Sequence, residues 1–242
     1  MINKTQSKHI IVLMSLFLFT SVLKAQDDRD FRFGFKVSPA INWVKVKDGR
    51  MNSGATGLGF AYGLMGDFRL SENYAISTEF LITTFKSNVK SKPGDTFTRD
   101  NDFRTYSNLD YHYSLKYIQI PIAVKFKTKE IGAITYWGQF GIIPSFSIGN
   151  TVVSSAAPAF GLDEKYNPNV NDNNKYDFKT YEDNVNALRV AMLIGAGIEY
   201  RISGNTSITA GLRFDNGFTD FLNNKKVNAI NNGLGLHLGV FF

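Results

Sequence analysis

The stretch that decides the fold is LRVAMLIGAGIEYRIS, residues 188–203. Every second residue from Leu188 to Ile202 is apolar, whereas the residues between them are Gly, Ala, Ser, Arg and Glu with one Leu. A period of two is the signature of a β-strand, because successive side chains point to opposite faces. The strand therefore has one bulky, uncharged face and one face of small residues with isolated charges.

The same alternation recurs along the chain. It is as clear in GLGLHLGVFF, residues 233–242, as in the first stretch. Six more segments follow it: residues 31–46, 58–70, 74–86, 111–127, 133–148 and 206–218. The sequence thus predicts eight strands. Short turns and longer polar connections alternate strictly between them: the turns are 71–73, 128–132 and 203–205, and the longer connections are 47–57, 87–110, 149–187 and 219–232.

This alternation of connections predicts the fold class. It is typical of an all-β, eight-stranded antiparallel up-and-down transmembrane β-barrel with short periplasmic turns and long extracellular loops. An even number of strands places both termini in the periplasm. The small residues suit the lumen of a narrow barrel, and the bulky face is long enough to cross a bilayer when the strands tilt. A secreted soluble barrel or sandwich, with its apolar face turned inward, is the alternative.

Aromatic side chains near both ends of the strands fit the two interfaces of a membrane. Trp43 lies near the long-loop end. The interfacial aromatics predicted near the short-turn end are Phe68, Tyr74, Phe126 and Tyr200.

Composition and the N-terminus narrow the class of protein. The chain has 242 residues and no Cys, which excludes a disulfide scaffold, a thiol enzyme and a zinc-thiolate site. Lys4 and Lys8 precede an apolar run over residues 10–22, which predicts a signal peptide cleaved after Ala25. Residues 1–25 are then the signal peptide and residues 26–242 the barrel domain. The net charge of +6 includes three lysines of that segment, so the mature excess is too small to indicate nucleic acid as a partner.

Two motifs resemble a known family. FGFKVSP, residues 33–39, is similar to the first strand of the PorT-like outer-membrane β-barrel family of Bacteroidetes, and YIQIPI, residues 117–122, resembles its mid-chain strand. Gln119 stands where that motif often has Glu. The terminal Phe242 is similar to the aromatic residue that ends many outer-membrane barrels, which implies recognition by the barrel-assembly machinery. Members of the family include a component of the type IX secretion system, so the resemblance implies an outer-membrane location and little about function.

Charged residues on the small-residue face predict a network inside the lumen. In so narrow a barrel they must pair, because an unpaired buried charge costs several kcal/mol. The predicted network consists of Arg32, Lys36, Asp67, Arg69, Glu79, Arg189, Glu199, Arg201, Arg213 and Asp215. We interpret it as a plug; a narrow anion-selective path is the alternative.

Candidates for chemistry are few. His112 and Ser114 share one strand face, where His could activate the hydroxyl, but no orienting acid is evident. His237 is interpreted as a hydrogen-bonded lumen residue, and the run at residues 171–174 could offer oxygens to calcium but reads better as a solvated loop. No catalytic, cofactor or metal site is predicted.

Three functions remain open after the sequence. The first is a non-enzymatic barrel that binds a partner, as an accessory subunit of a secretion or assembly machine or as a surface-interaction protein. The second is a small porin for small or anionic solutes, and the third is a lipid-modifying enzyme using His112 and Ser114. The expected location is the Gram-negative cell outer membrane. The expected partners there are outer-membrane lipid and lipopolysaccharide, the barrel-assembly machinery and other outer-membrane proteins.

Overall fold

The computed structural model describes residues 31–46, 51–92, 97–98, 105–158, 175–177, 185–222 and 228–242. The predicted signal peptide and the run at residues 171–174 lie outside these ranges. None of the described segments is a helix long and apolar enough to cross a membrane.

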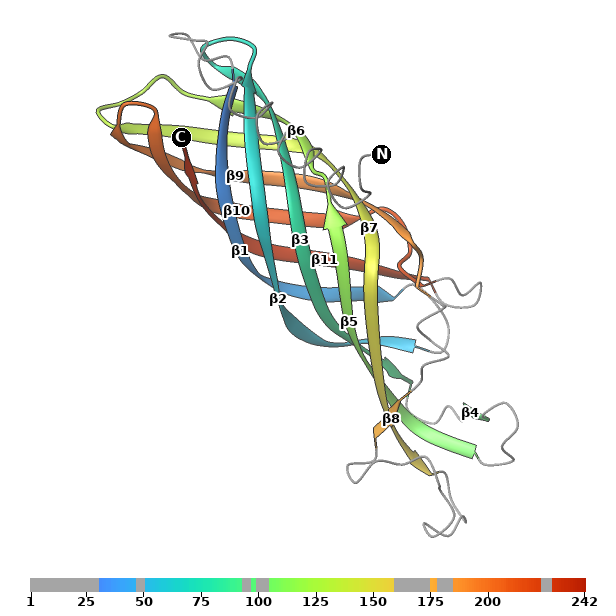
Figure 1. Cartoon of the computed structure of the whole chain (residues 1–242). Coiled ribbons are helices and arrows are strands. Elements are labelled where there is room, and N and C mark those ends of the chain that lie inside the picture. Colours follow the sequence, from blue (N-terminus) through green and yellow to red (C-terminus); the bar gives the residue numbers. More distant parts are fainter. Residues whose placement is uncertain are drawn as a thin grey trace, which may run out of the picture. The chain divides into compact units, whose positions relative to one another are not determined.

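The described residues form one antiparallel sheet (Figure 1). Its strands are β1 (Phe31–Val46), β2 (Met51–Arg69), β3 (Tyr74–Ser91), β4 (Phe97–Thr98), β5 (Thr105–Gln119), β6 (Ile122–Lys127), β7 (Ile134–Pro158), β8 (Lys175–Asp177), β9 (Leu188–Ser203), β10 (Thr206–Gly217) and β11 (Ala229–Phe241).

The sheet closes into a ring of eight strand positions, as the alternation predicts. β1 pairs with β2 on one side and with β11 on the other, and β2 pairs with β3. β5 and β6 share one position: the predicted strand 111–127 is interrupted at Ile120 and Pro121, and both halves pair with β3 and with β7. Pro121 has no backbone N–H to give to the ladder, so the interruption costs no hydrogen bond there.

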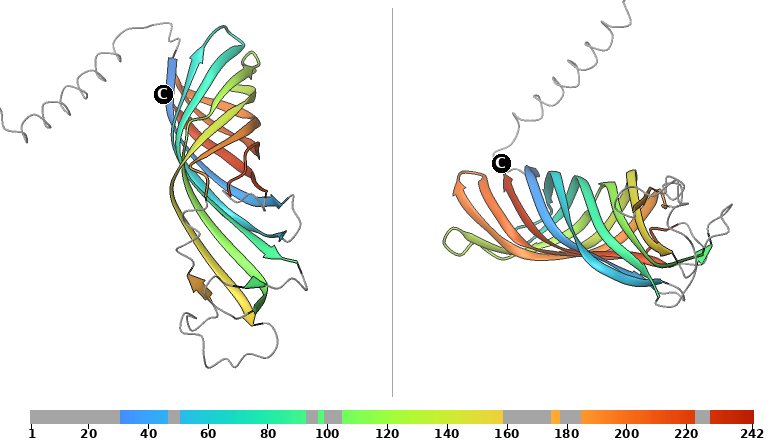
Figure 2. Two further views of the ribbon diagram at one scale, coloured as in Figure 1. Left: turned by 90° about the vertical axis from the view of Figure 1, so that its right-hand side faces the viewer. Right: turned by 90° about the horizontal axis from the view of Figure 1, so that it is seen from below.

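The predicted long connections are shorter than expected, because the strands continue into them. β2 begins at Met51, β3 runs to Ser91, β5 begins at Thr105 and β7 runs to Pro158. β2, β3, β5 and β7 therefore extend beyond the other strands of the ring, and the short strands β4 and β8 pair with β5 and β7 there (Figures 1 and 2). We call this end of the barrel the loop end. The opposite end, which carries the turns β2–β3, β6–β7 and β9–β10, is the short-turn end.

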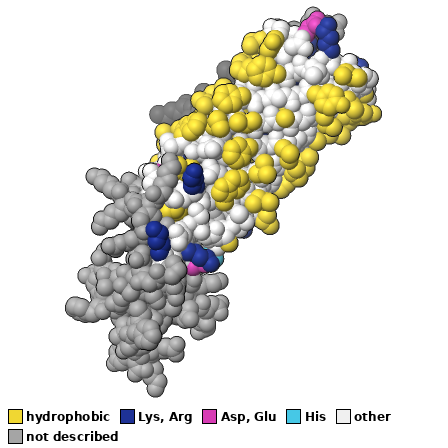
Figure 3. Space-filling view, turned by 180° about the vertical axis from the view of Figure 1, so that it is seen from behind, with side chains coloured by type: hydrophobic (Ala, Val, Ile, Leu, Met, Phe, Trp, Pro, Cys, Tyr) yellow, Lys and Arg dark blue, Asp and Glu magenta, His cyan; other side chains and the backbone are white. Residues whose placement is uncertain are grey.

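The strand faces have the predicted orientation. On β9 the bulky residues point outward, with Ile194 44% exposed, whereas Arg189 and Leu193 are buried inside. Large hydrophobic side chains are exposed on the outer wall, and on the face drawn in Figure 3 they lie between Lys and Arg side chains toward the two ends. We call this apolar outer wall the belt.

An apolar cluster fills the lumen at the loop end, which the sequence analysis did not predict. Phe85 and Tyr117 meet edge to face with ring centroids 5.8 Å apart, and Phe221, from the β10–β11 connection, meets Tyr113 at 5.2 Å. We call this group the loop-end cluster; its members are Val44, Phe85, Val89, Tyr111, Tyr113, Leu115, Tyr117, Val152, Phe221 and Ala229.

Candidate functional site in the barrel lumen

Two carboxylates from different sides of the barrel share three cations near the short-turn end. Asp67 on β2 and Glu199 on β9 are both bridged by Arg32 Nη2 of β1, at 3.0 Å to each carboxylate. Lys125 Nζ of β6 lies 3.0 Å from Asp67 Oδ2 and 2.7 Å from Glu199 Oε1. Lys127 Nζ lies 3.1 Å and 3.3 Å from the same two atoms. These five residues, here the mouth network, tie four strands together across the lumen.

The mouth network rests on an aromatic ring. The guanidinium of Arg32 lies 4.5 Å, and Lys125 Nζ 4.8 Å, from the ring centroid of Phe241, whose side chain is buried at the end of β11. Lys125 Nζ also lies 5.1 Å from the ring of Trp137. An aromatic face stabilises a cation most where water is excluded. The mouth network has three cations and two carboxylates, and the faces of the Phe241 and Trp137 rings partly offset the extra positive charge.

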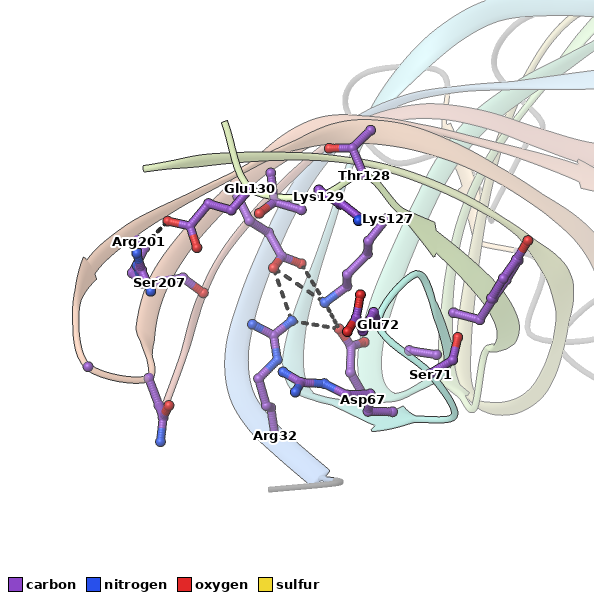
Figure 4. A pocket seen from close by; sticks show the side chains of 17 residues that line it. Arg32, Asp67, Ser71, Glu72, Lys127, Thr128, Lys129, Glu130, Arg201 and Ser207 are labelled. Atoms are coloured by element: carbon purple, nitrogen blue, oxygen red, sulfur yellow. Dashed lines mark hydrogen bonds and ion pairs between the residues drawn. The ribbon is translucent and has the colours of Figure 1, made fainter. Parts of the chain in front are cut away.

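Four residues of the mouth network, Arg32, Asp67, Lys127 and Glu199, line an open cavity at the short-turn end (Figure 4). The cavity has a volume of about 380 Å³. On its rim, Arg201 Nη2 lies 2.7 Å from Glu130 Oε1, and Arg201 is exposed. Arg69 also lines the cavity and is exposed. The cavity is therefore polar and mixed in charge, with access from the short-turn end.

A second ionic group lies deeper in the lumen. Glu79 on β3 accepts hydrogen bonds from Lys36 Nζ at 2.9 Å and from Arg213 Nη1 at 2.7 Å. Arg213 Nε in turn donates to Asp215 Oδ1 at 2.7 Å. These four residues, here the mid-lumen network, balance two cations against two carboxylates, and all four are buried.

Arg189 is held differently from the other lumen cations. Its side chain is fully buried, its Nη2 donates to the carbonyl oxygen of Asn231 at 3.0 Å, and its guanidinium lies 4.8 Å from the ring centroid of Phe85. Among the described residues no carboxylate forms an ion pair with it. Arg189 therefore joins the polar part of the lumen to the loop-end cluster.

Lumen glycines make room for large side chains. A Cβ at Gly197 would come within 2.6 Å of Trp137 Cζ2, and one at Gly211, its cross-strand partner, within 2.7 Å. Both the indole of Trp137 and the backbone of the neighbouring strand β10 therefore require a glycine at position 197.

The ten predicted network residues separate into two groups. Eight of them lie inside the barrel, but Arg69 and Arg201 do not: they sit at the cavity rim, because β2 and β9 end there. The prediction that Arg201 pairs with lumen carboxylates is wrong, since its partner is Glu130.

Lys125 and Lys127 belong to the mouth network, but the charge network predicted from the sequence did not include them. Both lie on the lumen-facing positions of the segment 111–127. The alternation therefore indicated that both lysines point into the lumen. It could not indicate their ion pairs with Asp67 and Glu199, because these depend on where β6 lies relative to β2 and β9 in the ring.

The family follows from a comparison with known proteins. Residues 24–223 match the family model described as outer membrane protein beta-barrel domain. The chain belongs to this family. It is therefore an outer-membrane β-barrel, and the outward apolar wall is its lipid-facing surface. A comparison with curated proteins found no match.

Several solved outer-membrane barrels are similar to this barrel in structure. Neisserial surface protein A is 13% identical, with 87% of this chain and 97% of that chain covered and a TM-score of 0.41. The attachment invasion locus protein Ail of Yersinia pestis is 12% identical, with 87% and 99% covered and a TM-score of 0.35. OprG of Pseudomonas aeruginosa is 10% identical, with 87% and 93% covered and a TM-score of 0.41.

The predicted interfacial aromatics of this outer-membrane barrel lie on its outer wall. Phe31 and Phe68 stack at 4.5 Å near the short-turn end, and Tyr74 meets Phe126 at 5.6 Å. Tyr200 is exposed, and Trp43 stacks on Phe214 at 6.2 Å nearer the loop end. The terminal residue Phe242 is also on the wall, 5.8 Å from Phe33.

The histidine candidates do not form a catalytic arrangement in the described residues. His112 Nε2 lies 3.8 Å from Asp110 Oδ2, an acid on the same strand face that the sequence analysis did not consider, but Asp110 also pairs with Lys90 at 3.4 Å. No hydrogen bond joins His112 to Ser114 within the described chain, since alternate residues of a strand lie about 6.6 Å apart.

His237 lies in the lumen as predicted, but not as a hydrogen-bonded residue. It packs against Trp137 at 5.0 Å and lies 4.0 Å from Glu79 Oε1, and among the described residues neither of its ring nitrogens has a hydrogen-bond partner. No group of three or more metal-ligating side chains occurs in the described part of the chain.

Proposed function

We propose that this outer-membrane barrel is a closed, non-enzymatic protein that works by binding a partner at its loop end. The observation that carries the proposal is the filled lumen. The mouth network, the mid-lumen network and the loop-end cluster follow one another along the barrel axis. Their side chains are buried, except for Arg32 and Lys127 of the mouth network, which are half-buried. A cavity between the mid-lumen network and the loop-end cluster, lined by Arg213, Asp215 and Phe85, has a volume of about 20 Å³, which is room for about one water molecule.

The loop end offers the contact surface. β2, β3, β5 and β7 extend there beyond the other strands of the ring, and a rigid sheet holds a binding surface better than free loops do. The partner is a component of an outer-membrane machine, for secretion or assembly, or a molecule met at the cell surface. In this proposal residues 1–25 are removed, residues 26–242 form the mature barrel, and both termini face the periplasm.

The more specific family assignment is also a proposal. The motif at residues 33–39 lies on β1, and the motif at residues 117–122 lies where β5 ends and β6 begins. These two segments support membership of the PorT-like group of Bacteroidetes. The aromatic residue Phe242 separately supports assembly through the barrel-assembly machinery.

A planar-bilayer recording tests the closed lumen. The refolded protein should give no steady open channel and no liposome swelling in small sugars. Stable, anion-selective current steps would contradict the proposal and would favour a small porin. Two observations favour that alternative: the mouth network has more cations than carboxylates, and it lines an open cavity.

Site-specific photo-crosslinking in the native outer membrane tests the binding surface. A photoreactive residue at Thr151, an exposed position of β7 at the loop end, should capture one defined protein or glycolipid. The matched control is Tyr136, on the same strand near the short-turn end. Capture from Tyr136 alone would place the partner elsewhere and contradict the proposal.

A further inference from the structure

The outer face of β3 and β5 changes character at one level. The pairing register sets their outward residues in rows: Ile82 opposite Ile118, then Thr84 opposite Lys116, Lys86 opposite Ser114, Asn88 opposite His112, and Lys90 opposite Asp110. The first row is apolar and belongs to the belt. Every row beyond it toward the loop end is polar or charged.

The inner face changes in the opposite sense over the same rows. Toward the loop end the buried inward residues are mostly apolar, with Phe85, Val89 and Leu115 and one polar exception, Ser87. Nearer the short-turn end Thr83 and Gln119 are polar, beside the apolar Leu81. Apolar inside and polar outside is the arrangement of a sheet in water, and the reverse is that of a sheet in lipid. The hydrocarbon of the membrane therefore ends between the row of Ile118 and the row of Lys116.

Neighbouring strands place the boundary at the same level. Phe60 on β2 lies opposite Thr84, and Phe146 on β7 lies opposite Ile118. Both are exposed on the outer wall. Aromatic residues prefer the interface between hydrocarbon and headgroups, so they support this position of the boundary.

Lysine side chains occupy the first two rows beyond the boundary. Lys86 and Lys116 are exposed and lie on adjacent strands, in adjacent rows. Lys90, one step further out, is paired with Asp110. Within the described residues no carboxylate forms an ion pair with Lys86 or Lys116, and like charges at neighbouring positions of a sheet repel. An anion that contacts both would relieve this repulsion.

We propose that Lys86 and Lys116 bind the phosphate groups of a phosphorylated lipid headgroup. Ammonium groups make charge-assisted hydrogen bonds to phosphate oxygens. The belt directly below, with Ile82 and Ile118, receives the acyl chains of the same molecule. A soluble anion satisfies only the lysines, whereas an amphiphile satisfies both the lysines and the belt. This inference goes beyond the proposed function, because it concerns the lipid around the barrel and not the partner of its loop end.

Native mass spectrometry of the mature protein in an uncharged detergent tests this site. The probe is lipid A carrying two phosphates, compared with the same lipid from which the phosphates have been removed. The double variant Lys86→Gln with Lys116→Gln should bind the phosphorylated lipid about twenty-five-fold more weakly, since each lysine near a charged lipid surface contributes about fivefold. The control variant Lys86→Arg with Lys116→Arg keeps both charges and should bind like the wild type.

Further measurements identify the source of the anion and show which results would overturn the proposal. The lipid without phosphates should bind the wild type as weakly as the phosphorylated lipid binds the Gln variant, and millimolar inorganic phosphate should not displace the lipid. Unchanged lipid binding by the Gln variant, shown to be folded by its heat-dependent gel migration, would overturn the proposal. A second result would also overturn the proposal: the Gln variant loses affinity for a sulfated polysaccharide but binds the phosphorylated lipid as well as the wild type does. The lysines would then bind a soluble polyanion and not the lipid.

Discussion

Glu199 is the residue on which the mouth network depends most, because it holds Arg32, Lys125 and Lys127 together with Asp67. The substitution Glu199→Gln keeps the shape of the side chain but leaves three cations with one carboxylate. Removal of one partner from a buried ion pair costs about 3–5 kcal/mol. We expect this loss in the free energy of unfolding, measured by urea titration in detergent micelles, and a lower temperature at which the folded gel band disappears.

The matched control at the residue scale is Glu130→Gln. Glu130 also accepts an ion pair from an arginine, Arg201, but that pair lies on the rim and is exposed to solvent. Exposed pairs are worth about 0–1 kcal/mol, so little change is expected. Equal losses in the two variants would show that the mouth network does not stabilise the barrel.

At the scale of the strand, charge tolerance should follow depth in the membrane. Ile194 lies outward on β9, within the belt, so Ile194→Arg should cost about 2–4 kcal/mol of unfolding free energy in lipid vesicles. Thr84 lies outward on β3 beside Lys116, at the interface, where Thr84→Arg should cost about 0–1 kcal/mol. A comparable loss at both positions would mean that the boundary has been placed at the wrong level.

The strands also show what the sequence could and could not predict. The period of two predicted the eight positions of the ring and the orientation of each face, because alternation is a local property of the chain. It did not predict how far the strands extend, because the alternation continues past the membrane with its polarity reversed. Val89 on β3 and Val152 on β7 point inward beyond the predicted strands, whereas Lys90 and Thr151 beside them point outward. The pairing of Lys125 and Lys127 with Glu199 could not be predicted either, since it requires the three-dimensional position of β6 relative to β9.

At the scale of the whole molecule, two kinds of side chain fill the lumen: charged ones in the two ionic networks and apolar ones in the loop-end cluster. Phe221 is fully buried in the loop-end cluster, and its connection is held by Asn186, whose Nδ2 donates to the carbonyl oxygen of Asp220 at 2.9 Å. The variant Phe221→Ala opens space in this cluster but leaves both ionic networks in place. We therefore expect it to remain silent in planar bilayers. A steady current through this single variant would show that the charged networks do not seal the lumen.

The pairing of β1 with β11 has a consequence for how the barrel assembles over time. It joins Gly34 to Phe241, so the ring cannot close until nearly the whole chain is present. Contacts between residues so distant in sequence make folding slow, since the loop entropy is lost before the contacts form. Phe241, which lies under the cations of the mouth network, arrives on the same strand, so ring closure and charge pairing are one kinetic event. Refolding into vesicles should accordingly show a single slow phase by gel migration, and a chain that ends before β11 should show no heat-resistant species at any time; a stable truncated intermediate would contradict this coupling.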